Sequence, residues 1–320
     1  MIRRAMLPIL LFALAMVVAA TQGASPRSPK VSRALPPKWS KAVTDVFFTD
    51  ARQKLVGERP NYGTAATVAK ASSPASAPTE IAPVSAAGSF AWSKLISRET
   101  IEDEIKSLQK QVSEDVTTLA KFKGGGYKAG RKEFTELALL FAIISQYDGD
   151  VRWKDKASGI RDLIARAGYN CKVGTDASYK EAKLRKDDLE QLVQGGSIST
   201  PEGNPDAKWD KIADRPPLMQ RIEQAQQQAI APWTANSGEF SKNADALLRE
   251  AELLAAMAEA IQQEGFEFAD DEAYLGFARQ MRDSALEVIS AVKGKNYDAA
   301  RAASGNIEKA CSGCHEGFRS

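Results

Sequence analysis

The sequence predicts an all-α protein in which two tandem four-helix bundles follow an export signal and a long linker. From about residue 90 onwards, apolar side chains recur at three- and four-residue steps, and strand signals are few. The segment 90–200 also resembles the segment 207–320, which indicates an internal duplication. Joints rich in glycine and proline separate the expected helices, which lie near 98–122, 129–147, 153–168, 178–195, 216–232, 238–264, 270–293 and 296–318.

Residues 1–24 have the pattern of a cleaved signal peptide. Arg3 and Arg4 precede an apolar run over 7–20, and small residues follow it. The run is shorter than the roughly 20 residues that span a bilayer, and no later stretch is longer. We therefore expect a mature chain without a transmembrane segment, located in the periplasm or otherwise outside the cytoplasm. An uncleaved anchor is the alternative.

Residues 25–89 are rich in alanine, proline, serine and threonine and predict a disordered linker. A short amphipathic helix is expected within it near 39–55, where Val46, Phe47 and Leu55 can share one face. This segment is expected to dock either on its own folded domain or on a partner.

The overall charge excludes some classes of partner. The chain has 43 basic and 41 acidic residues, and removal of Arg3 and Arg4 with the signal leaves 41 of each sign. This balance gives no reason to expect a nucleic acid or a membrane surface as partner.

The internal repeat is visible at residues that are not common helix formers. Trp92 aligns with Trp209, an offset of 117 residues, and Gly159 aligns with Gly276 at the same offset. After one inserted residue, Tyr179 aligns with Tyr297. Such matches over more than 100 positions indicate two copies of one unit, at 90–200 and 207–320.

The strongest motif is Cys311-Ser-Gly-Cys314-His315 near the C-terminus. A Cys-x-x-Cys-His run is the attachment signature of a c-type haem, in which both thiols form thioethers and the histidine binds the iron. Zinc half-site, redox dithiol and chance are the alternatives. The export signal favours haem, and His315 is the only histidine, so no second pair completes a zinc site.

The first copy lacks the two cysteines and the histidine of the motif, and one further cysteine of the chain remains to be explained. Val193, Gly196 and Ser197 align with the two cysteines and the histidine, so we expect a single covalent haem c, in the second copy. The remaining Cys171 has no partner for an intramolecular disulfide. A buried inert thiol and an intermolecular bridge are its two expected roles.

The second axial position of the iron needs a residue other than histidine. Met219, just after a proline pair at an expected helix start, is the predicted distal ligand, and Met257 and Met281 are its rivals. Arg215 and Arg319 are candidates to pair with haem propionates, because a guanidinium matches carboxylate geometry.

These residues resemble a known family. A helix that reads Cys-x-x-Cys-His-x-x-Phe-Arg, at the end of a unit of roughly 110 residues, is similar to that of the class II c-type cytochromes, the cytochrome c′ family. The spacing of Arg215 and Met219 is similar to that of its Met-ligated, low-spin members. The resemblance covers 207–320 and implies an antiparallel four-helix bundle with His315 as proximal and Met219 as distal ligand.

We therefore expect an exported mono-haem cytochrome that acts in electron transfer, with an unidentified redox partner protein. The haem-less bundle is then a module for docking or dimerisation, so a homodimer is one expected assembly. A five-coordinate gas-binding or sensing protein is the first alternative, and an interaction protein with a structural haem is the second. No enzyme signature is present in the sequence.

Overall fold

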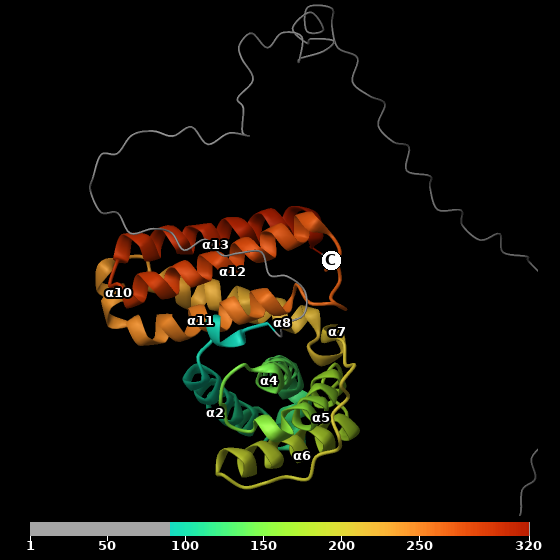
Figure 1. Cartoon of the computed structure of the whole chain (residues 1–320). Coiled ribbons are helices and arrows are strands. Elements are labelled where there is room, and N and C mark those ends of the chain that lie inside the picture. Colours follow the sequence, from blue (N-terminus) through green and yellow to red (C-terminus); the bar gives the residue numbers. More distant parts are fainter. Residues whose placement is uncertain (1–89, 320) are drawn as a thin grey trace, which may run out of the picture. The chain divides into compact units, whose positions relative to one another are not determined.

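The computed structural model describes residues 90–319, which belong to one compact unit (Figure 1). The described part is mostly helical and contains no strand, which confirms the predicted all-α class. No helix within 90–319 has the length and apolar character to cross a bilayer. The predicted signal peptide, the linker and the amphipathic segment 39–55 lie outside the described residues.

The N-terminal helix group is built around α4, whose side chains are buried without interruption from Glu133 to Ile144. Helices α2, α5 and α6 pack on it. Ser97 caps α2 by accepting from the amide of Thr100, and Thr175 begins α6 with a capping box. The elements are η2 (Trp92–Lys94), α2 (Arg98–Asp115), α3 (Leu119–Lys121), η3 (Phe122–Gly126), α4 (Tyr127–Gln146), η4 (Lys154–Lys156), α5 (Ala157–Asn170) and α6 (Asp176–Val193).

In the C-terminal helix group, α12 packs between α11 and α13 along most of its length. Figure 1 shows α12 and α13 side by side in orange and red. The α-helical geometry of α8 ends at Gln224, where a π-helical segment, η5, continues it. The elements are α7 (Trp209–Ile212), α8 (Arg215–Gln224), η5 (Ala225–Ile230), α9 (Ala231–Trp233), α10 (Ser237–Lys242), α11 (Ala244–Ala260), α12 (Glu272–Lys293) and α13 (Tyr297–Phe318).

Two predicted helices are shorter than expected. The helix expected over 98–122 ends at Asp115, where Val116 leaves helical geometry and Thr118 caps a new turn. Two β-branched threonines follow Val116, and β-branched side chains weaken a helix. The helix expected over 238–264 is divided at Asn243, whose side chain bonds back to Glu239 and so competes with the helical backbone.

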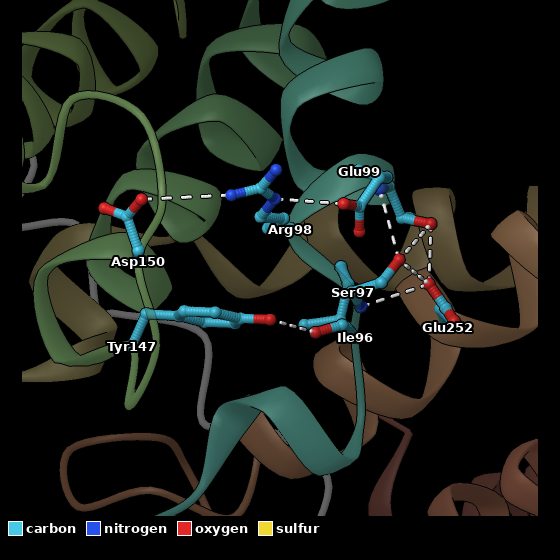
Figure 2. Close-up of polar contacts among 8 residues, drawn as sticks. Ile96, Ser97, Arg98, Glu99, Tyr147, Asp150 and Glu252 are labelled. Carbon is cyan, nitrogen blue, oxygen red and sulfur yellow. Dashed lines mark hydrogen bonds and ion pairs between the residues drawn. The ribbon is translucent and has the colours of Figure 1, made fainter.

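The two groups share one continuous core, and polar contacts connect them at several points. Glu252 of α11 reaches the start of α2, where its Oε2 accepts from the amide of Ser97 at 3.1 Å and from its hydroxyl at 2.6 Å (Figure 2). The hydroxyl of Thr100 donates to the same oxygen at 2.6 Å. A carboxylate at this end of a helix also stabilises the helix dipole.

A buried arginine lies at the centre of the junction. The Nε of Arg221 in α8 donates to both carboxylate oxygens of Glu136 in α4 at 2.9 Å. Its two terminal nitrogens reach Glu250 of α11 at 3.0 and 3.2 Å, and Glu104 of α2 lies at 3.8 Å. Burial opposes the charge on Arg221, yet these three carboxylates raise its pKa. Burial raises the pKa of Glu104 and of Glu136, and Arg221 opposes that rise in both.

Glu133 is a buried carboxyl of α4 outside this cluster. Burial, and then the neighbouring Asp115, raise its pKa to about 8 from an ordinary value of 4.5. Among the described residues its Oε2 has no hydrogen-bond partner. Cys171 is fully buried near this carboxyl, and burial raises the pKa of its thiol to about 12. The predicted burial of Cys171 is confirmed.

Replacing Glu252 should loosen the junction. We expect Glu252→Ala to lower the free energy of unfolding by about 2–3 kcal/mol, because three hydrogen bonds to one charged oxygen are lost in a buried setting. Urea denaturation measures this loss. Glu264→Ala is the control, since Glu264 pairs only with exposed Lys208 and should change stability by less than about 0.5 kcal/mol. An equal loss of stability in both variants would contradict the role of Glu252 in joining the two helix groups.

Glu133 should make stability fall as pH rises. Its pKa is higher in the folded chain than in the unfolded chain, so the folded state binds the proton more tightly between pH 5 and 8. The contribution of Glu133 to the free energy of unfolding then declines by up to about 1.4 kcal/mol per pH unit between pH 5 and 8.

Unfolding by urea at several pH values checks this dependence. Glu133→Gln should flatten the decline between pH 5 and 8, while Glu114→Gln, at an exposed position, should keep it. An unchanged slope in Glu133→Gln would show that Glu133 is ionised throughout.

Candidate functional site

The cysteine–histidine motif lies on the last two turns of α13. The predicted apolar stripe of this helix is buried from Ala300 to Ala310. Cys311 and Cys314 continue that stripe and are half-buried, whereas His315 is exposed. The three- and four-residue steps therefore place both thiols at the edge of the core.

Aromatic packing fixes the C-terminal end of α13. The ring of Phe318 packs edge-on against Phe268 at 5.2 Å and Tyr274 at 5.6 Å between centroids. Arg215 of α8 stacks over Phe268 at 5.0 Å and donates to the carbonyl of Phe318 at 2.9 Å. This aromatic cluster holds the last turn of α13 against α12 and α8.

Gly313, between the two cysteines, is required by a close contact. A Cβ at this position would lie 2.7 Å from Cε1 of Phe277 in α12. The absence of a side chain therefore lets the Phe277 ring approach the backbone of α13. No atom lies within 4 Å of the corresponding position at Gly317, one turn later.

A cavity of about 550 Å³ lies between α8 and the end of α13, beside the contact of Arg215 with Phe318. Farther along, the continuation of α8 through η5 and α9 packs directly on α13, so the space opens at one end of the group. The cavity brings together all the residues that the sequence predicted for the site. These residues are Arg215, Met219, Cys311, Cys314, His315 and Arg319.

Two of the three candidate methionines line this cavity. Met219 extends from α8 and is half-buried, while Met281 extends from α12 on the neighbouring wall. The thiol of Cys311 lies 3.9 Å from the Sδ of Met281. Met257 is 1% exposed, within α11, and does not line the cavity. Met219 and Met281 therefore have access to the site.

Arg215 has partners of its own in the protein. In addition to its bond to Phe318, its Nη1 lies 2.6 Å from Glu267. In the N-terminal group, Arg98 and Asp150 hold the corresponding positions and lie 3.8 Å apart (Figure 2). This ion pair recurs in the group without the cysteines, which indicates that it stabilises the fold. Arg319 is exposed at the rim of the cavity.

A buried side-chain amide with an unpaired oxygen lies in the lining of the cavity. Gln226 is 6% exposed within η5, and its Nε2 donates to the carbonyl of Ser304 at 3.2 Å. Its Oε1 is buried and has no hydrogen-bond partner among the described residues. The aligned stretch of α2 is regular α-helix, and the π-helical segment of the N-terminal group, η3, lies at a different position. Such segments are frequent at functional sites.

The two cysteine thiols lie in surroundings that favour their neutral form. Burial, then Cys314 and Glu308, raise the pKa of Cys311 to about 11, and burial raises the pKa of Cys314. Reactive redox dithiols have lowered pKa values instead. Within the described residues, no group of three or more His, Cys, Asp or Glu side chains is placed to hold a metal ion.

The N-terminal group differs at the aligned place. Helix α6 ends at Val193, and the chain at Gly196 and Ser197 is no longer helical. The indole of Trp153 donates to the carbonyl of Leu192 at 3.2 Å and covers this end of the helix. Side chains of the protein itself therefore occupy the position that in the other group adjoins the cavity.

Sequence reasoning did not find several residues that shape the site. Phe277 and Tyr274 line the cavity from α12, and Gln226 lines it from η5. Tyr274, Phe277 and Met281 follow the three- and four-residue spacing of one helix face, which is the signal that could have grouped them. The sequence contains no comparable signal for Gln226.

The lining suits a flat, largely apolar group anchored on α13. Two thiols and an imidazole lie on one wall, a methionine lies on each of two others, and a buried amide oxygen is left without a donor. Comparison of the chain with protein-family models, curated proteins and solved structures gives no match.

Enlarging Gly313 should disturb the site. We expect Gly313→Ala to destabilise the protein by about 1–3 kcal/mol, because the new methyl group displaces the ring of Phe277 or the backbone of α13. Gly317→Ala is the matched control in the same helix and should be neutral or stabilising by up to about 1 kcal/mol. Thermal unfolding of both variants measures the difference, and similar stabilities would contradict the contact.

Proposed function

We propose that this protein is an exported mono-haem c-type cytochrome that transfers electrons. When bound, haem supplies one-electron chemistry through the change in valence of its iron. Electron transfer is the whole function in this proposal, without an enzymatic reaction. The proposal places the protein in the periplasm or otherwise outside the cytoplasm, where its redox partner is another protein.

One observation carries the proposal. The attachment motif on α13 and Met219 on α8, more than 90 residues apart in the chain, line the same cavity. A thioether opposite a neutral imidazole is an established pair of axial ligands and raises the reduction potential. Neither the zinc nor the dithiol alternative explains why a methionine and a volume of about 550 Å³ adjoin the motif.

Each residue of the site has a distinct role in this proposal. Cys311 and Cys314 hold the haem covalently, His315 is the proximal ligand and Met219 the distal ligand. The rings of Phe277 and Tyr274 cover the cavity from α12 and limit the access of water to it. Arg319 at the rim is the better candidate for a propionate partner, because Arg215 already pairs with Glu267.

We also infer that the two helix groups are copies of one four-helix bundle, of which only the second carries haem. Helices α2 and α4 begin at Arg98 and Tyr127, and 117 residues later α8 and α11 begin at Arg215 and Ala244. The same division gives the proposed domains 90–200 and 207–320.

Contacts between aligned residues support this duplication. The rings of Trp92 and Trp209 lie 5.6 Å apart, and Glu104 lies 3.8 Å from Arg221. Both pairs join residues separated by the same 117 positions. Two-fold symmetric dimers place equivalent residues in contact at their axis, so the copies pack like the subunits of a fused dimer.

The optical spectrum of the purified protein tests the proposed function. Produced with its export signal in a host that matures c-type cytochromes, the chain should gain the mass of one haem and show a low-spin iron. Met219→Leu should abolish the low-spin signature, because leucine keeps the volume but lacks the sulfur. Met281→Leu makes the same change on the neighbouring wall of the cavity and should keep that signature.

Other results separate the alternatives. A high-spin spectrum in the unchanged protein would favour the five-coordinate gas-binding function. Loss of the low-spin signature in Met281→Leu alone would reassign the distal ligand. A colourless protein with both thiols of Cys311 and Cys314 free would refute the cytochrome.

A further inference from the structure

Helix α8 has two functional faces. Arg215, Met219 and Gln226 lie along one side of α8 and η5 and line the cavity. Arg221 lies roughly 200° around the helix from Met219 and is buried. That second side packs against α4 of the N-terminal group.

Helix α8 is supported by both helix groups. Its α-helical part spans only Arg215–Gln224, and the π-helical segment η5 continues it. Within the C-terminal group it packs on α11, and Arg215 at its start donates to the carbonyl of Phe318 at the end of α13, beside the cavity. Its contact with α4 is more extensive than its contact with α11.

An ion pair from the other group fixes the start of α8. Arg131 of α4 donates from Nε to Asp214 at 3.1 Å and also bonds to it through Nη2. Lys172 lies 3.3 Å from the same carboxylate. Asp214 is the N-cap residue of α8, but its side chain makes no capping bond, since it is directed to Arg131 instead. The N-terminal group therefore holds the residue from which α8 begins.

A second link lies beside Met219 on the opposite face. Arg221 is two residues farther along, and its guanidinium is bound by Glu136 of α4. Two residues along a helix correspond to a rotation of roughly 200°, so the side chain that binds α4 and the side chain that enters the cavity point in opposite directions. With both links made, α8 has little freedom to turn about its axis or to move away from α13.

We propose that the haem-less N-terminal group is the support that positions α8, and that Arg131 and Asp214 are positioning residues for the distal methionine. The inference rests on the proposed function, since it gives the haem-less first bundle a role at the iron. The N-terminal group then sets how firmly Met219 is presented to the cavity, without contributing a residue to it.

The test uses the full chain with Arg131→Gln, Asp214→Asn and both changes together. Two quantities are followed on heating, the low-spin absorption and the overall helix signal. In the unchanged protein the two should be lost together. In each variant, the low-spin signature should disappear at least about 2–4 °C before the helices melt, because α8 moves away while the rest stays folded.

Amide hydrogen exchange provides a readout that does not depend on haem. In peptides that cover 215–224, exchange should become about fivefold faster in both single variants, and the double variant should add little. Arg166→Gln is the matched control. It removes an ion pair with Glu181 inside the N-terminal group and should change neither readout.

The outcomes separate the two proposals. The positioning role of Arg131 and Asp214 is overturned if the low-spin absorption and the helix signal shift together on heating, or if neither shifts. This holds even when amide exchange is faster. If the unchanged protein takes up no haem, the cytochrome is refuted and exchange alone decides whether the N-terminal group supports α8. If the Arg131 and Asp214 variants then exchange at the same rates as Arg166→Gln, the N-terminal group does not support α8.

Discussion

The buried guanidinium of Arg221 is the constraint on which the arrangement of the helices depends. It lies in α8 and meets carboxylates from α2, α4 and α11, so one side chain connects four helices and both groups. Desolvating a charge is costly, and the cost is offset only while its partners stay in place. Any movement that separates these helices leaves a charge buried without a partner, which stabilises a single packing of the groups.

In the proposed duplication, the two copies have diverged where they meet and where the site lies. At the junction, the position of Arg221 in one copy is held by Glu104 in the other, so a repeated sequence became complementary in charge. At the far end of the bundle, α13 carries the cysteines and borders a cavity, while α6 ends early and is covered by Trp153. In the proposed cytochrome, one copy thus holds the cofactor and the other stabilises the helix that faces it.

The sequence was informative where chemistry requires a fixed spacing. Cys311, Cys314 and His315 follow the steps of a helix face, and the helix that the pattern predicts over 296–318 agrees closely with α13. It was less informative where a helix ends for local reasons. The break after Asp115 and the division at Asn243 depend on side chains that bond the backbone, and these bonds compete with an otherwise continuous apolar pattern.

By itself, the sequence determined the all-α class and the three- and four-residue spacing of Cys311, Cys314 and His315 on the last helix, because these depend on neighbours three and four positions away. Only the tertiary structure decided which methionines reach the cavity, that Arg215 pairs with Glu267, and that the first group holds α8 through Asp214. These contacts join residues far apart in the chain. They depend on how helices pack and on which buried charges find partners, and helical periodicity carries no information about either.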